Sequence, residues 1–428
     1  MIKHVNSTFE ETYYEGKCDN GLKVVIWHKP TYHTTSCLFG VPYGSLDLKQ
    51  CDENGNIIEM PSGIAHFLEH KLFESDHSDV MEEFSKLGCN VNAFTSYNET
   101  CYYFDTASQE DIAKPLNLLL DFVQSLNISE ESVTKEKGII DQELQMYLQM
   151  PDSRIVFETF KALYHHHPLS NDIGGNHDSV YATSKALLEE CYGLNYHPNK
   201  MYLIIATPLD PAYLFKLICD NQNQKVFVKD KKLTRYIPQE PQEVYKENVH
   251  IKMDVEMPRV SLGIKLTREG HDPKQKLKEE WILRMILEAH FSSLNADYQT
   301  WLDEKKISPL FYCENDNTVD HDLIVFVDES SDAQAFKEFI NEQLVMIKNK
   351  PIDETCLKQM KNRHFGSVMR IFNRIENITI QHFRNMMNGL DIFSLLSLID
   401  SITVQDCIEL YSSLDLSNQS LIVIDNND

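Results

Sequence analysis

The sequence predicts an α+β protein of two similar domains, each an antiparallel-rich mixed sheet packed with helices. Three observations predict this fold class. Runs rich in β-branched and aromatic residues alternate along the chain with stretches of helical periodicity. The order of these elements is similar on either side of one charged, proline-containing segment, residues 229–248. Strands interleaved with helices in each half favour sheets that are covered by helices.

The first half begins with strand signals. Residues 20–44 hold two runs of alternating, β-branched and aromatic character, and helical stretches follow at 62–74 and 79–87. A hairpin is expected next, with strands over 90–96 and 100–106. The remaining elements expected in this half are amphipathic helices over 109–126 and 132–149, a buried strand over 202–207 and a helix from Asp210.

Residues 229–248 (KDKKLTRYIPQEPQEVYKEN) are charged, contain two prolines and have little apolar periodicity, so they are the predicted linker. The expected domains are therefore residues 1–228 and residues 249–428. The elements expected after the linker are strands near 250–255, 260–266, 311–313, 323–327 and 421–424, and helices near 274–296, 333–348 and 353–388.

Composition limits the partners. The chain has 428 residues and a formal net charge of −25. Nucleic acid and anionic membrane surfaces both require a basic protein surface, so neither is an expected partner. The charge itself has two interpretations, which are simple solubility and an acidic chamber that attracts basic peptides.

Targeting and cysteine usage indicate a cytoplasmic protein. The N-terminal residues MIKHVNSTFEETYYEG lack the apolar core of a secretory signal. No apolar run approaches the roughly 18 residues that a membrane span needs. The ten cysteines form no CxxC pair, which argues against a thiolate zinc site and favours reduced, buried thiols.

One short motif carries metal chemistry. His66 and His70 are four residues apart in a stretch of helix formers, so both imidazoles project from one helix face and can bind one metal ion. Glu69 lies on the same side, where a carboxylate can take a proton from water. This is the HxxEH arrangement, the reverse of HExxH.

The alternative for this motif is a chance match on a polar surface helix. Two histidines and one glutamate at fixed offsets are an event of about a few per cent over a chain of this length. A surface helix fits poorly, because the intervening residues are apolar and buried imidazoles need partners. Those residues are Ile64, Ala65, Phe67 and Leu68.

A catalytic zinc site needs a third protein ligand. Glu143 is a candidate, and Glu136 stands seven residues earlier on the same face of a predicted helix. Glu143 could ligate the metal while Glu136 orients a ligand histidine. Two glutamates at this spacing are also typical of a solvated helix face, so the residues alone leave both interpretations open.

A collinear set of motifs resembles the insulinase/pitrilysin (M16) family of zinc peptidases, in particular its short bacterial members. The set comprises the HxxEH helix, Asn92-Ala-Phe-Thr-Ser with Tyr102-Tyr-Phe, LDFVQS, Glu136 with Glu143, Asp152-Ser-Arg154, and His167-Pro168 with Gly174-Gly175. The resemblance implies zinc ligands at His66, His70 and Glu143. It implies a general base at Glu69 and a supporting glutamate at Glu136.

The resemblance also implies contacts for the substrate. In the family, the strand that matches Asn92, Ala93, Phe94 and Thr95 is an exposed edge beside the zinc, to which an extended peptide adds by main-chain hydrogen bonds. These residues can also serve simply to build a hairpin, and the two roles are compatible.

The second half has no second HxxEH motif. In the family, this half supplies an arginine and, seven residues later, a tyrosine that holds the developing oxyanion. Tyr312 lies in a suitable predicted strand, but Lys305 stands seven residues earlier and Asp303 lies near the aligned position. The arginine is therefore missing or moved, and Tyr312 alone is carried over.

Two other groups of histidines are predicted to be structural. Consecutive residues cannot converge on one ion without contortion, so His165-His166-His167 is expected to form a loop. His290 has no nearby partner in the sequence and is expected to pack within a helix bundle, as are Trp281 and Trp301 at apolar helix positions.

The sequence therefore predicts a zinc metalloendopeptidase acting on short or unfolded peptides. Two alternatives stay open, which are a maturation protease for one modified peptide and a non-catalytic, peptide-binding subunit of a two-chain peptidase. The resemblance implies a chain half as large as the four-domain relatives. The expected partners are thus a peptide and a second chain, either a homodimer copy or a heterodimer partner that is a related chain lacking the motif.

Overall fold

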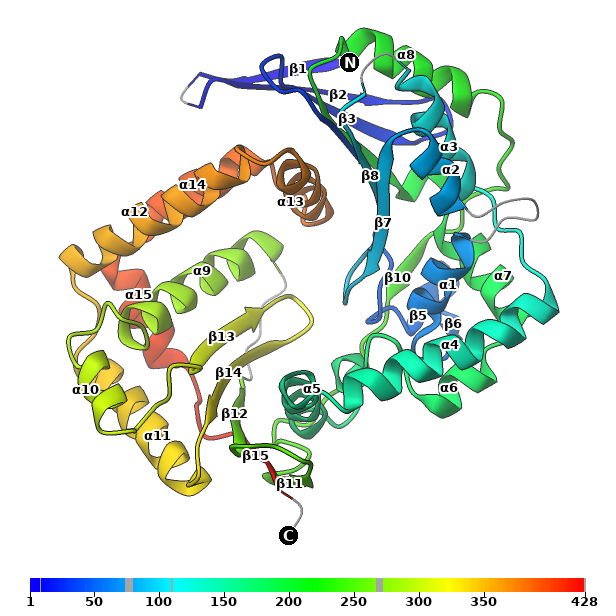
Figure 1. Cartoon of the computed structure of the whole chain (residues 1–428). Coiled ribbons are helices and arrows are strands. Elements are labelled where there is room, and N and C mark those ends of the chain that lie inside the picture. The colour runs from blue at the N-terminus through cyan, green and yellow to red at the C-terminus, as the bar shows by residue number, and fades with distance from the viewer. Residues whose placement is uncertain (8, 74–79, 109–110, 267–271, 427–428) are drawn as a thin grey trace. The chain divides into compact units, whose positions relative to one another are not determined.

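The computed structural model describes residues 1–7, 9–73, 80–108, 111–266 and 272–426. By the density of their packing these residues form two compact units. Unit 1 comprises residues 1–144, 171–236 and 369–387, and unit 2 comprises residues 145–170, 237–368 and 388–428. Each unit has its own sheet, and each is described separately (Figure 1).

Unit 1 contains a seven-stranded sheet in the order β1-β2-β3-β9-β4-β8-β7. Neighbouring strands are antiparallel except β3 and β9, which run parallel. The strands are β1 (Ile2–Asn6), β2 (Glu11–Lys17), β3 (Lys23–His28), β4 (Thr35–Val41), β7 (Cys89–Thr95), β8 (Thr100–Thr106) and β9 (Tyr202–Thr207). The central strands β4 and β9 are buried along their whole length, and β7 lies at one edge.

Helices cover both faces of this sheet. In Figure 1, α3 and α8 lie on one face and α13 lies on the other. The apolar residues of α3 recur at helical spacing, and these buried side chains turn one face of the helix to the sheet. The helices are α1 (Ile64–Leu72), α2 (Val80–Lys86), α3 (Ala113–Val123), α4 (Glu130–Leu148, within unit 1 up to Leu144), α6 (His177–Ala182), α7 (Lys185–Asn195), α8 (Pro211–Gln222) and α13 (Ile375–Met387), with the short 3-10 helix Pro198–Lys200.

A second, three-stranded sheet in unit 1 has the order β10-β5-β6, with β5 (Lys49–Asp52), β6 (Ile57–Glu59) and β10 (Leu233–Arg235). The strand β10 comes from the segment predicted to be a linker. Arg235 at its end binds both carboxylate oxygens of Asp47 at 2.8 and 2.9 Å, so this part of the segment is fastened to unit 1.

Unit 2 contains a five-stranded sheet in the order β11-β15-β12-β14-β13. Only β11 and β15 run parallel among its neighbouring strands. The strands are β11 (Asn248–Lys252), β12 (Arg259–Lys265), β13 (Tyr312–Asn317), β14 (Asp322–Glu329) and β15 (Gln419–Asp425). The helices are α5 (Pro151–Leu163), α9 (Pro273–His290), α10 (Tyr298–Asp303), α11 (Ala333–Asn349), α12 (Glu354–Ile371, within unit 2 up to Val368), α14 (Ile392–Ser401) and α15 (Val404–Ser413), with the short 3-10 helix Pro168–Ser170.

One face of each sheet is covered by a helix that is distant in sequence from most of its unit. The unit 1 sheet is covered by a helix near the C-terminus, and the unit 2 sheet by a helix from the N-terminal half of the chain. The helix α13 packs on β4 and β9 of unit 1, and α5 packs on β12 and β15 of unit 2. A glycine permits each close approach. A Cβ on Gly40 of β4 would lie 2.6 Å from the ring of Phe383, and a Cβ on Gly263 of β12 would lie 2.6 Å from Thr159.

The predicted fold class is confirmed, since both units are helix-covered, antiparallel-rich mixed sheets. The predicted strands and helices recur within a few residues. The strands β1, β2, β5, β6 and β10 and the helices α5, α6, α7, α10, α14 and α15 were not predicted. Predicted helix termini at residues 74, 79 and 109–110 lie outside the described residues. The helical stretch predicted over 353–388 is present as two helices, α12 and α13, with a short interruption between Ile371 and Ile375.

The division of the chain into domains at residues 1–228 and 249–428 stays a proposal.

Across the described residues, no helix has the length and apolar character needed to cross a membrane.

Candidate metal centre

The motif residues lie on one short helix, α1, in unit 1. Its apolar side chains Phe67 and Leu68 are buried in the core cluster that also contains Phe39 and Phe104 of the sheet. This packing leaves the face with His66, Glu69 and His70 only partly buried. The two imidazole rings lie 4.5 Å apart between centroids, as the four-residue spacing predicts.

Glycines allow the chain to approach the start of α1 closely. Gly63 precedes the helix with a φ of 85°, a conformation that favours glycine. A Cβ on Gly63 would lie 2.2 Å from the carbonyl oxygen of Gly174. A Cβ on Gly174 would lie 3.4 Å from Nδ1 of His66 and 2.8 Å from Leu144. The Gly174-Gly175 pair therefore leaves room beside the histidine ring.

The helix α4 places two glutamates against α1. Glu143 Oε2 lies 3.4 Å from His70 Nε2 and 3.7 Å from His66 Nε2. Glu136 lies two turns earlier, and its Oε1 accepts a hydrogen bond of 3.0 Å from His70 Nδ1. Glu143 and Glu136 thus contact the two different ring nitrogens of His70. These two contacts fix the orientation of the His70 ring.

Donor atoms of His66, His70 and Glu143 all lie within 4.8 Å of one another. Two ligands about 2.1 Å from a tetrahedral ion are about 3.4 Å apart, which matches the contacts that Glu143 makes with the histidines. The donor set is two imidazole nitrogens and one carboxylate oxygen, a combination typical of catalytic zinc with one open position. These residues therefore fit a zinc ion.

Burial and these contacts shift the pKa values of the histidines and glutamates. Burial and the neighbouring His70 lower the pKa of His66 to about 4. Burial also opposes protonation of His70, but its hydrogen bonds to Glu136 and Glu143 outweigh burial and raise its pKa to about 9. The hydrogen bond from His70 lowers the pKa of Glu143. Binding of a metal ion would therefore compete with a proton at His70.

Glu69 lies beside this group without being one of the three convergent donors. Its Oε2 accepts a hydrogen bond of 2.7 Å from the hydroxyl of Thr95, at the end of edge strand β7. Burial raises the pKa of Glu69, although the Thr95 hydrogen bond and the nearby His70 act in the opposite direction. A carboxylate in this setting can exchange a proton with a group held at the metal position.

The predicted substrate strand is the edge strand of the seven-stranded sheet. Residues Asn92 to Thr95 pair with β8 on one side only, for example Ala93 with Tyr102. Asn92 is exposed, and its Oδ1 accepts a hydrogen bond of 2.9 Å from the N–H of Ala93. Figure 1 shows β7 ending close to α1.

Tyr312 begins the edge strand β13 of unit 2 and is 39% exposed. Burial of its hydroxyl, together with the charge of Glu314, raises the pKa of Tyr312 to about 12. A cavity of about 610 Å³ in unit 2 is lined by Tyr312, Phe311 and Arg284, among others. Lys305 follows α10 with a φ of 56°, and Asp303 is the last residue of α10.

The four histidines that were predicted to be structural make structural contacts. The segment His165-His166-His167 is a loop, as predicted, and all three backbone N–H groups bind the carboxylate of Glu240 at 2.7 to 2.9 Å. His290 is bonded to Gln343 at 3.2 Å and packs against Trp301, which confirms its packing role.

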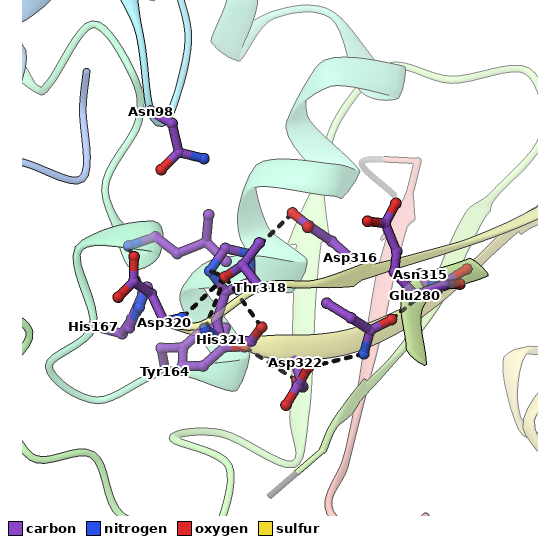
Figure 2. Close-up of polar contacts among 12 residues, drawn as sticks. Asn98, Tyr164, His167, Glu280, Asn315, Asp316, Thr318, Asp320, His321 and Asp322 are labelled. Atoms are coloured by element: carbon purple, nitrogen blue, oxygen red, sulfur yellow. Dashed lines mark hydrogen bonds and ion pairs between the residues drawn. The ribbon is translucent and has the colours of Figure 1, made fainter. Parts of the chain in front are cut away.

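A second group of polar side chains lies in unit 2, around the turn between β13 and β14. His321 and Asp316, both labelled in Figure 2, are bonded through His321 Nε2 and Asp316 Oδ2, which lie 2.9 Å apart. Asn317 donates from Nδ2 to Asp322 Oδ1 at 3.0 Å. Lys276 binds the other oxygen of Asp322 at 2.5 Å. Both carboxylates have hydrogen-bond partners close by, and these contacts link residues of the turn to one another and to α9.

Sequence reasoning missed two contacts at the metal centre. Thr95 was expected to bind substrate through its main chain, and no contact of its hydroxyl with Glu69 was predicted. Lys71 is buried, with its Nζ 3.6 Å from Glu136 Oε2. A lysine in the middle of an otherwise apolar helix face was the available signal, because a buried ammonium needs a partner.

Comparison with known families covers most of the chain. The family described as insulinase (Peptidase family M16) matches residues 23–177, which include all the motif residues of α1 and α4. The family described as the Peptidase M16 inactive domain matches residues 183–363. The second match agrees with the absence of an HxxEH motif from that part of the sequence.

Individual relatives extend this agreement. The protein named uncharacterized zinc protease YmfH of Bacillus subtilis is 32% identical over 408 residues, which cover 95% of each chain. The crystal structure of an M16-like protein from Alicyclobacillus acidocaldarius superimposes with a TM-score of 0.92 at 28% identity, covering 97% of this chain and 99% of that one. The periplasmic protease PqqL of Escherichia coli, at 20% identity and a TM-score of 0.73, shares the fold over 97% of this chain and 48% of its own.

Proposed function

The chain belongs to the insulinase family, peptidase family M16, and from this premise we propose that it is a zinc metalloendopeptidase that hydrolyses short or unfolded peptides. The observation that carries the proposal is the convergence of donor atoms from His66, His70 and Glu143. An assembly of two imidazoles and a carboxylate, next to a further buried carboxylate, suits hydrolysis better than a purely structural role.

In this proposal His66, His70 and Glu143 are the zinc ligands. Zinc bound there would act as a Lewis acid toward the peptide carbonyl and would lower the pKa of a water molecule. Glu136 orients the His70 ring through its hydrogen bond to Nδ1, so that Nε2 is presented together with the Glu143 carboxylate.

Glu69 is the proposed general base. Its carboxylate takes a proton from the attacking water and later delivers that proton to the amine that leaves. Burial raises the pKa of Glu69, a shift in the direction that suits a carboxylate which first accepts a proton and later returns it.

The proposed substrate is an extended peptide that adds to the free edge of β7, at Asn92, Ala93, Phe94 and Thr95. Main-chain hydrogen bonds along this edge would give affinity with little dependence on side chains. The peptide would displace the contact between Asn92 and the N–H of Ala93. A folded protein cannot present such a strand, so short or unfolded peptides are the expected class.

Tyr312 is the proposed donor to the developing oxyanion. Because its pKa is raised to about 12, the hydroxyl keeps its proton at neutral pH and can donate a hydrogen bond. Neither Lys305 nor Asp303 is assigned the role of the family arginine, since the first has an unusual positive φ and the second has the opposite charge.

We further propose a cytoplasmic enzyme that works as a dimer. The chain corresponds to about half of PqqL, 48% of that protein's length, so a second chain would complete an assembly of comparable size. The second chain is either another copy or a related chain that lacks the HxxEH motif. Light scattering tests the first case, and a pull-down from the native cell tests the second; a monomer with full peptidase activity would rule out both.

One combined experiment tests the proposed function. Elemental analysis of the chain, purified without chelator, should give about one zinc per chain, and a peptide library should then be cleaved internally. Cleavage of many sequences supports a general endopeptidase. Zinc binding with cleavage of a single modified peptide would indicate the maturation protease, and peptide binding without cleavage would indicate a non-catalytic subunit. Absence of zinc at neutral pH would overturn the proposal.

A further inference from the structure

Two cysteines that are far apart in the sequence have their sulfur atoms in direct contact in unit 1. The Sγ atoms of Cys18 and Cys219 lie 2.7 Å apart across a separation of 201 residues. The sulfur atoms of three other cysteines contact oxygen instead. Cys51 and Cys89 contact main-chain carbonyl groups, and Cys191 contacts the hydroxyl of Tyr43. The contact between Cys18 and Cys219 differs from these because it joins two sulfur atoms.

Both cysteines are held by well-bonded segments. Cys18 begins the turn between β2 and β3, which is closed by hydrogen bonds between Cys18 and Leu22 and between Gly21 and Cys18, both of 2.9 Å. Cys219 lies in the last turn of α8, which packs on β3. The two segments are also joined by Asn20 Nδ2 donating to Gln222 Oε1 at 2.8 Å. Little motion of the backbone is therefore needed to join the sulfurs.

The exposure of the two thiols differs in a way that suits disulfide exchange. Cys18 is buried, at 4% exposed, whereas Cys219 is only partly buried. Because Cys219 is the more exposed of the two, a reagent can reach it first, and Cys18 is already in place to resolve the product. Burial raises the pKa of both thiols, which favours their protonated forms.

We propose that Cys18 and Cys219 are a redox-active pair that forms an intramolecular disulfide and locks the β2–β3 turn to α8. The oxidant is a low-molecular-weight disulfide. The Cys219 sulfur, as its thiolate, attacks one sulfur of that molecule and releases one thiolate. The Cys18 sulfur, losing its proton, then attacks Cys219 and releases the second. The two cysteines lose two electrons and two protons, and the small disulfide becomes two thiols.

This bond would close a loop that includes both α1 and α4. Cross-linking residues 201 positions apart restricts the unfolded chain strongly, so oxidation should stabilise the protein. Among the described residues, the partners of Cys18 and Cys219 do not include His66, His70 or Glu143, so the bond would change the stability of unit 1 without changing the donor set.

The test uses the full chain equilibrated with glutathione disulfide or with dithiothreitol at pH 8.5. Free thiols are then alkylated and the peptides are mapped by mass spectrometry. The oxidised sample should contain one cross-linked peptide pair, joining Cys18 to Cys219. Its melting temperature should be higher than that of the reduced sample by on the order of 5–10 °C.

Two variants separate the outcomes. Cys219→Ser should abolish both the cross-link and the gain in melting temperature, while Cys356→Ser, which removes a partly buried thiol of unit 2, should retain both. The proposal is overturned if both thiols stay open to alkylation after oxidation, if glutathione stays attached to Cys219, or if other cysteine pairs form in equal yield in the folded protein. None of these readouts depends on peptidase activity.

Discussion

The hydroxyl of Thr95 donates a hydrogen bond of 2.7 Å to Oε2 of Glu69, so that the edge strand β7 and the motif helix α1 are joined at the catalytic carboxylate proposed here. The main chain of Thr95 also acts on this carboxylate, since burial raises the pKa of Glu69 and both the hydroxyl and the backbone of Thr95 lower it. The hydrogen bond from the hydroxyl places the last residue of the proposed peptide-binding edge in contact with the proposed base.

Thr95→Val should lower kcat while leaving zinc content unchanged. The valine keeps the shape of the side chain but cannot donate, and loss of a hydrogen bond to a charged group should reduce turnover by about 10- to 100-fold. Thr95→Ser retains the hydroxyl and should recover most of the activity. The prediction would fail if the serine and valine variants were equally impaired, because the effect would then come from packing.

Glu69→Gln should bind zinc normally and lose turnover. The amide has nearly the same shape as the carboxylate but cannot accept a proton from water. Zinc content and peptide cleavage are measured on the same preparation. Loss of zinc from this variant would show that Glu69 is a ligand and that its role has been assigned wrongly.

Glu136→Gln should weaken zinc binding by roughly 10- to 100-fold without abolishing it. The carboxylate holds Nδ1 of His70 at 3.0 Å, and the amide can no longer stabilise the proton on that nitrogen as strongly. Competition with a metal chelator measures the affinity. Glu131→Gln, exposed on the first turn of the same helix, is the matched control and should bind zinc as the wild type does.

The local parts of the candidate site were predictable from the sequence. The spacing of His66 and His70 fixes their common face once the segment is helical, and the structure places both there. Glu143 is different, because helical spacing alone could not distinguish a ligand from a solvated face. Only the packing of α4 on α1 brings its carboxylate to the histidines, and the resemblance to a family was needed to expect that.

The exchange of α5 and α13 between the two sheets was not predictable from the sequence. Both helices have ordinary amphipathic patterns, which show that a face is buried but not which sheet buries it. The glycines that permit their approach, Gly40 and Gly263, lie in strands where a small residue has several explanations. Such long-range pairings depend on the topology of the whole chain.

Tyr312→Phe should lower kcat by roughly 100- to 1000-fold, with zinc content unchanged, if its hydroxyl is the oxyanion donor. The phenyl ring fills the same space, so only the hydrogen bond is removed. Tyr245→Phe, at an exposed tyrosine of unit 2, is the control for loss of a hydroxyl. Unchanged kcat in Tyr312→Phe would remove this residue from the mechanism.

In unit 2, Glu280 lies on α9 near Asp316 (Figure 2), and its ionisation makes the stability of this unit depend on pH. Burial raises the pKa of Glu280 to about 7; Arg284 opposes this shift, and the charge of Asp316 adds to it. The folded state therefore holds a proton that the unfolded state releases between about pH 4.5 and pH 7. Stability from this group is present at the acidic end of that window and is lost as the pH rises through it.

Glu280→Gln removes this titration, since the amide stays neutral at all these pH values. The melting temperature of the variant relative to wild type should therefore rise by about a few degrees between pH 5 and pH 8. Glu342→Gln, at an exposed position on α11, controls for the removal of one negative charge. A difference that is constant with pH, or that falls as the pH rises, would contradict the assignment, because only a carboxyl group that is protonated in the fold produces this sign.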